Sequence, residues 1–242
     1  MTRVALCRLD RPSSVVMAMP LSVEEKDSLA RATTPKRRRE IDVSRRLIRY
    51  GLHAYLELPT DSTLHWGKKG PRSVGLPPSI GMSVAHSARH AAVALSTRGS
   101  VGVDVESTES PPAWQEIMTG FFCDQDVEWI ARTDAPRGAD GLRRFYAIWT
   151  AREAYAKLRQ GSVLDRLSQP VLREWVGADG RDVRAASGRA CRVEIFVGDG
   201  WIVALCRELH ESMLPGMVAA LEDDEDIESC KPGFVFLVED HQ

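Results

Sequence analysis

The segment from residue 82 to residue 106, MSVAHSARHAAVALSTRGSVGVDVE, carries the pattern that decides the fold. It contains three short apolar runs, Met82–His86, Ala91–Ser96 and Val101–Glu106. The linkers between them, Ser87-Ala-Arg and Thr97-Arg-Gly, have the length that is typical of hairpins. We therefore predict an antiparallel meander of three strands.

Helical patterns precede this segment, after a first strand that we expect over Val4–Leu9. Ser22, followed three residues later by Glu25, is typical of a capped helix start. Apolar residues then recur at helical spacing over residues 40–56. Residues 60–80 are rich in Gly, Pro, Ser and Lys, and we expect them to form one long loop.

The chain after Ser110-Pro-Pro, which we take as a boundary, again places helices before strands. We expect a mixed helical region over residues 113–131, a loop over 133–141 and a helix over 142–159. Two strands, over residues 191–197 and 201–206, then flank the turn Gly198-Asp-Gly. We therefore predict an α/β (α+β) fold with subdomains over residues 1–109 and 110–242.

Composition limits the class of protein. The 242 residues are 43% hydrophobic and 27% charged, as in ordinary globular proteins. No apolar run reaches the roughly 18 residues of a membrane-spanning helix, and the N-terminus lacks the apolar core of a secretory signal. The five cysteines include no CxxC pair, so the sequence suggests neither a zinc site nor a disulfide framework. We expect a reduced, cytoplasmic protein.

The net charge of −2 conceals two opposed blocks. Residues 31–49 hold eight basic and two acidic residues, and this basic block is a candidate anion site. Residues 222–228 hold six acidic residues and no basic one. We interpret this acidic stretch as solvated, and expect a chain that ends at Leu221 to remain functional.

The strand over residues 101–106 carries two carboxylates on one face. Side chains alternate along a strand, so Gly102, Asp104 and Glu106 share the face opposite the valines. The two carboxylates would lie roughly 6–7 Å apart, which allows both to reach one hard cation such as magnesium. The alternative is the solvated face of a half-buried strand.

A second constellation lies on the helix over residues 142–159. Trp149, Glu153 and Lys157 recur every four residues and so form one stripe. Glu153 could supply a metal ligand or a base, and Lys157 could hold a phosphate. The alternative is a surface pair of Glu153 with Lys157, worth only about 0.3–0.5 kcal/mol, with Trp149 in the core.

Three further features could bind phosphate. His86 and Ser87 stand at a strand end, where both can donate hydrogen bonds, although a structural histidine is an alternative. Arg45 and Arg49 share a helical face in the basic block, and arginine suits bidentate phosphate binding. A nucleic-acid patch would look similar, but aromatic residues do not interleave this block. The loop Trp66-Gly-Lys-Lys-Gly-Pro71 adds glycines and lysines.

The order of these motifs resembles that of the 4′-phosphopantetheinyl transferases of the Sfp (surfactin synthetase-activating) type. The specific motifs are Gly102-Val-Asp-Val-Glu106 and Trp149-Thr-Ala-Arg-Glu-Ala-Tyr-Ala-Lys157, and the matching segments run from about residue 35 to residue 161. The resemblance implies a pseudo-twofold monomer of two similar α/β subdomains. Each would have helices packed on a small, mainly antiparallel sheet, with coenzyme A in the cleft between them.

The resemblance also implies an activity. The enzyme would transfer the 4′-phosphopantetheine arm of coenzyme A to a serine of an apo acyl, peptidyl or polyketide carrier protein, and would release 3′,5′-adenosine bisphosphate. Magnesium would be required, and neither nucleic acid nor membrane would be a partner. The implied metal ligands are Asp104, Glu106 and Glu153, the implied catalytic residues are Glu153 and Lys157, and the implied coenzyme contacts are Arg38, Arg45, Lys68, Lys69, His86, Ser87 and Lys157.

The sequence departs from the family pattern in three places. Arg152 stands where lysine is usual, the glycine-rich stretch is reduced to Gly161-Ser-Val, and the loop offers both Lys68 and Lys69 for one nucleotide contact. Two other functions remain open. One is a non-catalytic polyanion or nucleic-acid binding module that uses the basic block. The other is a different magnesium-dependent phosphate enzyme that uses Asp104 and Glu106.

Overall fold

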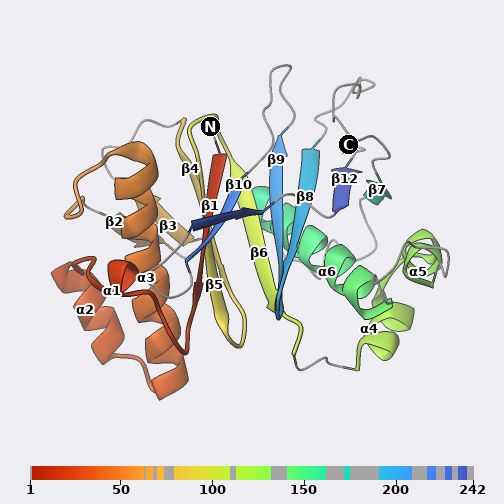
Figure 1. Cartoon of the computed structure of the whole chain (residues 1–242), viewed down its shortest axis with the longest axis horizontal. Helices are drawn as coiled ribbons and strands as arrows, with labels where there is room; N and C mark the ends of the chain where they lie inside the picture. Colours follow the sequence, from red (N-terminus) through yellow and green to blue (C-terminus); the bar gives the residue numbers. More distant parts are fainter. Residues whose placement is uncertain are drawn as a thin grey trace.

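The computed structural model places two groups of helices on either side of two sheets (Figure 1). It describes residues 2–62, 64–67, 70–73, 79–109, 113–131, 141–161, 172–174, 191–208, 217–221, 227–230 and 234–238. No helix among these ranges is both long and apolar enough to cross a membrane.

The first sheet contains five strands in the order β11-β10-β1-β5-β4. Their bounds are Ile227–Cys230, Met217–Leu221, Thr2–Arg8, His90–Ser96 and Gly81–His86. The helices beside it are α1 (Ser14–Met17), α2 (Val23–Ala30) and α3 (Pro35–Leu56). A separate hairpin joins β2 (Leu64–Gly67) to β3 (Gly70–Ser73), so the single loop expected over residues 60–80 is wrong. The glycine and proline content of that segment concealed both short strands.

The helix α3 begins earlier than its apolar pattern indicates. The Thr34 side chain accepts a hydrogen bond of 3.1 Å from the Arg37 backbone, and Pro35 occupies the first helical position. The first turns are polar and exposed, so apolar spacing could not reveal them. The capped start at Ser22 and Glu25 is confirmed, with both hydrogen bonds of the capping box present.

The second sheet also contains five strands, in the order β6-β9-β8-β12-β7. Their bounds are Val101–Ser107, Trp201–Glu208, Cys191–Gly198, Phe234–Val238 and Leu172–Glu174. The helices beside it are α4 (Trp114–Phe121), α5 (Asp124–Ala131) and α6 (Gly141–Leu158). The hairpin between β8 and β9 is confirmed, and Gly200 in its turn has the positive φ of 75° that glycine tolerates.

The predicted three-strand meander is correct for two strands only. β4 and β5 pair antiparallel, whereas β6 pairs with β9, about a hundred residues away. β6 instead lies beside β4, where the Val103 backbone donates a hydrogen bond of 3.1 Å to the Ser83 hydroxyl. A short linker keeps two strands close together in space, but it does not determine whether they pair within the same sheet.

Three apolar clusters hold these layers together. The first lies between α3 and the first sheet, and it contains Leu47, Ile48 and Val93. The second contains residues of both sheets, including Leu6 and Val103, and so joins one sheet to the other. The third lies between α6 and the second sheet. The arrangement of helix, sheet, sheet and helix confirms the predicted mixed α/β class (Figure 1).

The sheets do not divide the chain at residue 109. β6 precedes that position but belongs to the second sheet, while β10 and β11 follow it and join the first. β10 pairs in parallel with β1, from Arg3 opposite Met217 to Cys7 opposite Leu221. The expectation for a chain ending at Leu221 needs correction, because such a chain lacks both β11 and the interior strand β12. Residues 222–226 of the acidic stretch lie outside the described residues.

Candidate active site

The site is built where β6 faces α6. The valines at 101, 103 and 105 are buried in the cluster between the sheets, as their alternation predicts. Gly102, Asp104 and Glu106 therefore face α6. A β-carbon on Gly102 would lie 1.9 Å from the Ala154 carbonyl oxygen, so only glycine lets α6 approach this closely. The close approach brings the carboxylates of β6 against the side chains of α6.

Asp104 and Lys157 form the central contact of the site. The Lys157 ammonium donates a hydrogen bond of 2.8 Å to Oδ1 of Asp104. Burial raises the pKa of Asp104, and the charge and hydrogen bond of Lys157 oppose that rise. The solvated strand face considered from the sequence is thus excluded, because Asp104 is only 6% exposed.

Glu106 lies two residues further along the same face. Burial, and next the neighbouring charge of Asp104, raise its pKa to about 7. The Trp149 indole donates a hydrogen bond of 3.2 Å to Oε1 of Glu106 and partly opposes this shift. A carboxyl group with a pKa near neutrality can exchange a proton at physiological pH.

Glu153 completes a group of three acidic side chains. Burial raises its pKa, and the charge of Asp104 raises it further, while Lys157 lowers it. Glu153 in turn contributes to the raised pKa of Glu106. The structure therefore brings together four residues that the sequence singled out, Asp104, Glu106, Glu153 and Lys157.

His86 lies at the end of β4, on the first-half side of this group. Its Nε2 is 3.1 Å from Nη1 of Arg37, and the same Arg37 nitrogen is 3.1 Å from Oε2 of Glu40. An arginine can only donate, so Nε2 of His86 accepts. Burial lowers the pKa of His86, and the charges of Arg37 and Lys157 lower it further against the opposing charge of Glu40.

Glu40 is a residue of this contact that sequence analysis missed. The signal available was its position three residues after Arg37 on one helix, where opposite charges pair. That spacing gives no indication of the third partner, His86, which comes from another strand.

Ser87 is held by a network of hydroxyl groups. Its Oγ lies 2.9 Å from Oγ of Ser107, which also lies 3.2 Å from Nδ1 of His90 and accepts from the Arg89 backbone at 3.3 Å. Ser107 closes β6, so this network fastens the β4–β5 turn to the strand that carries the carboxylates.

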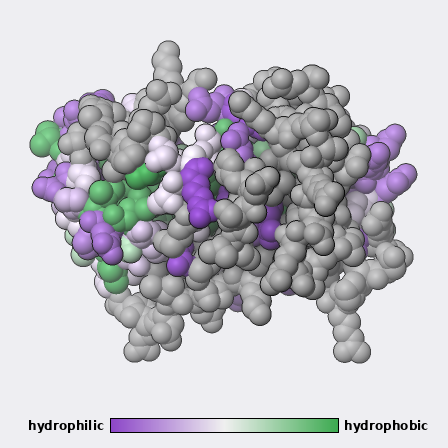
Figure 2. All heavy atoms as spheres, turned by 90° about the horizontal axis from the view of Figure 1, so that it is seen from above, coloured by the Kyte–Doolittle hydropathy of each residue, from purple (hydrophilic) through white to green (hydrophobic). Residues whose placement is uncertain are grey.

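A pocket of about 330 Å³ adjoins Glu106. Its apolar side includes Ile117 and the rings of Phe145 and Trp149, whose centroids are 6.1 Å apart. Its polar side includes Arg89, Ser107 and Glu109. Seen from above, strongly hydrophilic atoms are exposed in the middle of the molecule (Figure 2).

The acidic group offers the oxygen donors that magnesium prefers. Oδ2 of Asp104 is buried and has no hydrogen-bond partner among the residues that the structure describes, which is costly for an acceptor atom. A divalent cation would satisfy it and would offset the crowded negative charge. Within the described ranges, however, no group of three or more His, Cys, Asp or Glu side chains is arranged to hold a metal ion. The donor chemistry thus fits magnesium, and a three-ligand arrangement is not part of the observed geometry.

The other expected phosphate contacts lie apart from this group. Arg45 is only 7% exposed. Its guanidinium donates to the Glu25 carbonyl at 3.0 Å and lies 4.4 Å from the centre of the Trp66 ring. These contacts hold Arg45 within the packing of α3, and its expected role as a phosphate contact stays a prediction. Arg38 is exposed at the start of α3, and Lys68 and Lys69 lie outside the described residues.

Arg152 points away from the site. Its guanidinium forms a buried ion pair with Asp126 of α5 and lies 5.8 Å from the centre of the Phe122 ring. Arg152 therefore ties α6 to α5. The glycine stretch after α6 is described only as far as Gly161.

Comparison with known proteins agrees with this geometry. Residues 100–206 match the model of a family described as the 4′-phosphopantetheinyl transferase superfamily. The matched segment includes β6 and α6, which carry the three acidic residues of the site and Lys157.

Individual relatives carry similar names. The chain is 28% identical over 172 residues to slr0495 of Synechocystis sp., named as a 4′-phosphopantetheinyl transferase, an alignment that covers 70% of this chain and 69% of that protein. It is 30% identical over 142 residues to the 4′-phosphopantetheinyl transferase pptA of Paxillus involutus, covering 52% and 54%. It is 29% identical over 97 residues to the 4′-phosphopantetheinyl transferase AcpT of Salmonella typhimurium, covering 40% and 49%.

The matches to pptA and AcpT thus span about half the length of those relatives. The chain is therefore similar over β6 and α6 to the 4′-phosphopantetheinyl transferase superfamily, and the names of its relatives confirm the enzyme class expected from its sequence.

Proposed function

We propose that this enzyme transfers the 4′-phosphopantetheine arm of coenzyme A to a serine of an apo carrier protein. The observation that carries the proposal is the buried group of Asp104, Glu106 and Glu153 with Lys157, placed beside an apolar pocket. Transfer of a phosphoryl group depends on positioning and on positive charge more than on covalent chemistry. The released product would be 3′,5′-adenosine bisphosphate.

The pocket beside Glu106 would take the pantetheine arm. The arm is a thin, mainly apolar chain, and the stacked rings of Phe145 and Trp149 offer it an apolar wall. Ser107 and Arg89 offer hydrogen-bond partners to its two amides. The phosphate to which the arm is attached would then lie near Glu106, Asp104 and Lys157.

Glu153 would accept the proton of the carrier serine. A serine hydroxyl is a weak nucleophile and needs a base nearby. A carboxylate with a raised pKa is a stronger base than one in water, and burial together with Asp104 raises the pKa of Glu153. Lys157 would hold the phosphate oxygens on which negative charge accumulates.

Magnesium would be held by Asp104 and Glu106, with Glu153 beside them. The ion would supply positive charge to the pyrophosphate of coenzyme A. The partnerless Oδ2 of Asp104 supports this assignment. On this view, Lys157 keeps Asp104 in its charged form, against the burial that favours the neutral form.

The first half would hold the remaining phosphates. His86, Arg37 and the exposed Arg38 lie on the side of the site formed by α3 and β4. Ser87 would add a hydroxyl donor at the turn after β4. The residues of the proposed site all come from one chain, so we propose that the enzyme is a monomer of the Sfp type. It would act in the cytoplasm on acyl, peptidyl or polyketide carriers.

A polyanion-binding module is less well supported. Three arginines of the basic block, Arg45, Arg46 and Arg49, are all engaged inside the first half. Arg49, for example, forms a buried ion pair with Glu25 at 2.8 Å. Arg45 and Arg49 hold α2 against α3, whereas Arg46 pairs with Asp42 and donates to the Met17 carbonyl at the end of α1. These cations are therefore not free to bind a backbone of phosphates.

The proposal is tested by incubating the purified enzyme with magnesium, coenzyme A and several apo carrier proteins, and by measuring the intact mass of each carrier. A gain of one phosphopantetheine on at least one carrier supports the function, and chelation of magnesium should abolish the gain. Absence of transfer to fatty-acid, polyketide and peptide carriers alike would contradict it.

A further inference from the structure

We propose that the ion pair between Arg89 and Glu109 determines how large a group on the sulfur of coenzyme A this enzyme accepts. The inference rests on the proposed function, because it assumes that the pocket beside Glu106 takes the pantetheine arm. It adds a pair of residues that limits the length of the acyl group on a coenzyme A thioester.

The direction of the pocket follows from the pairing of β6 with α6. Asp104 meets Lys157, and Glu106 meets Trp149, so the strand and the helix run in opposite directions. The pocket extends from Glu106 and Trp149 toward Glu109 on one side and Phe145 on the other. An arm whose phosphate lies at the acidic group would therefore place its sulfur near Glu109.

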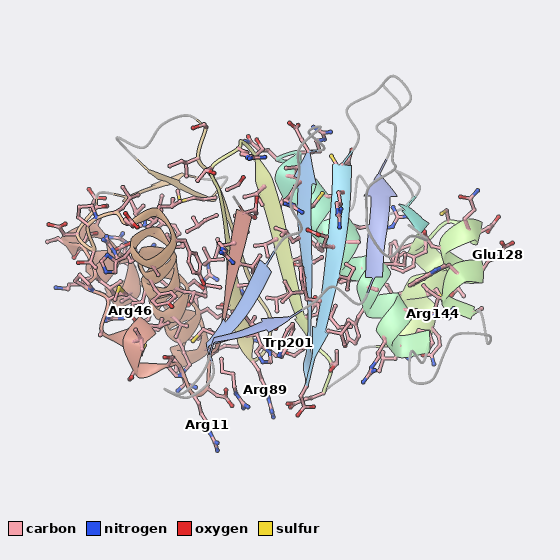
Figure 3. The ribbon with its side chains drawn as sticks, turned by 45° about the horizontal axis from the view of Figure 1, so that its top comes forward. Arg11, Arg46, Arg89, Glu128, Arg144 and Trp201 are labelled. Atoms are coloured by element: carbon pink, nitrogen blue, oxygen red, sulfur yellow. The ribbon has the colours of Figure 1, made fainter. Side chains whose placement is uncertain are left out.

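Two residues that line the pocket, Arg89 and Glu109, form an ion pair. Nη1 of Arg89 contacts Oε2 of Glu109 and so joins the β4–β5 turn to the segment that follows β6. Both side chains line the pocket, and they are 47% and 40% exposed to solvent. Figure 3 shows Arg89 at the lower rim of the molecule, between the helices of the first half and those of the second.

Both partners are fixed by their backbones. The Arg89 backbone donates to Ser107, while the Thr108 backbone donates a hydrogen bond of 3.0 Å to the Gly200 carbonyl. A β-carbon on Gly200 would lie 3.1 Å from Oε1 of Glu109, so the glycine leaves room for this carboxylate. The ion pair thus stands at a defined distance from the acidic group.

This arrangement favours a small group on the sulfur. A thiol hydrogen does not reach the ion pair, whereas a long alkyl chain must run across it. An alkyl chain that covers the two charged groups displaces their hydration water and offers no hydrogen bonds in return, which costs free energy. The ion pair itself is exposed and contributes little to stability. We therefore expect coenzyme A and short acyl thioesters to react well and long acyl thioesters to react poorly.

The test compares coenzyme A with octanoyl-coenzyme A as donors, with mass spectrometry of the carrier as the readout. In the Arg89→Ala/Glu109→Ala double variant, the ratio of kcat/KM for octanoyl-coenzyme A to that for coenzyme A should rise about tenfold. The Arg89→Gln/Glu109→Gln variant removes the charges at similar size, so it should also raise the ratio. The control is Asp42→Asn/Arg46→Gln, which removes another ion pair, within α3 and away from the pocket, and should leave the ratio unchanged.

The outcomes separate the two proposals. An unchanged ratio in both pocket variants would overturn the role of the ion pair, as would a wild-type enzyme that uses both donors equally well. Failure of the wild-type enzyme to transfer from coenzyme A itself would overturn the proposed function, and the role of the ion pair with it.

Discussion

Lys157 of α6 and Asp104 of β6 are joined by a hydrogen bond of 2.8 Å, although one is 31% exposed and the other is almost completely buried. The exposed ammonium can leave its partner for a ligand, because water can replace the contact. The buried carboxylate has no water to replace the lysine, and burial favours its neutral form, so its negative charge depends on Lys157. The pair is therefore asymmetric, and its two members should respond differently to mutation.

The Asp104→Asn variant removes the buried charge at constant size. It should unfold no more easily than the wild type at pH 7, because burial penalises the charged form and Lys157 can turn to solvent. Transfer should fall by a factor of about 100 or more, as is usual when a charged group of a phosphoryl-transfer site is lost. Thermal unfolding and the carrier mass assay measure the two effects, and a large drop in stability would refute this reading of the pair.

The Gly102→Ala variant tests the close contact of α6 with β6. The added carbon would lie 1.9 Å from the Ala154 carbonyl oxygen, so the helix must move away. Overpacking of this kind costs about 1–3 kcal/mol of unfolding free energy, and transfer should fall because Glu153 and Lys157 move with the helix. The control is Gly120→Ala in α4, where no described residue lies within 4 Å of the added carbon and stability should rise slightly.

Arg152 is expected to matter for stability and not for chemistry. Removing one member of a buried ion pair leaves an uncompensated charge, at a cost of about 3–5 kcal/mol. The Arg152→Met variant should therefore unfold far more easily in urea, while the protein that is still folded should transfer at the wild-type rate. The Arg152→Met/Asp126→Leu double variant should recover much of the stability. A selective loss of kcat in folded protein would show instead that Arg152 reaches the reaction.

His90 makes stability depend on pH. Burial lowers its pKa in the folded state below the ordinary value of 6.5, with Arg8 and Arg89 acting in the same direction against Asp10 and Glu109. As the pH falls, His90 therefore binds a proton in the unfolded chain at a higher pH than in the folded protein. The folded state is destabilised below about pH 6.5 as a result. The His90→Asn variant should lose less stability than the wild type between pH 7 and pH 5.5. Parallel losses in urea denaturation would rule out this contribution.

The C-terminal strands should be required for folding. A chain that ends at Leu221 loses β11, which pairs with β10, and β12, which lies between β8 and β7. Exposed edges on both sheets should lower stability and promote aggregation. Circular dichroism and light scattering of the truncated chain would check this, and a soluble, cooperatively folding product would contradict it.

The sequence predicted those features of the site that depend on local periodicity. Alternation along β6 placed Asp104 and Glu106 on one face, and helical spacing placed Glu153 and Lys157 on one stripe. Both patterns follow from the geometry of a single element, so one sequence is enough to see them.

The partners of each element were harder to predict. The pairing of β6 with β9, the contact of Glu40 and Arg37 with His86, and the burial of Arg45 against Trp66 all join distant segments. A charged residue such as Arg152 reads in sequence as part of a motif, and only the position of α5 shows that it serves packing. Such contacts depend on how layers pack, which no local pattern encodes.

The most direct test of the central claim is a comparison of Glu153→Gln with Glu116→Gln in the carrier mass assay. Glu153 belongs to the acidic group, whereas Glu116 is exposed on α4, so the two variants make the same chemical change at different places. We predict that Glu116→Gln adds phosphopantetheine to the carrier at the wild-type rate and that Glu153→Gln, folded and able to bind coenzyme A, adds almost none. Equal rates for the two variants would contradict the proposed site.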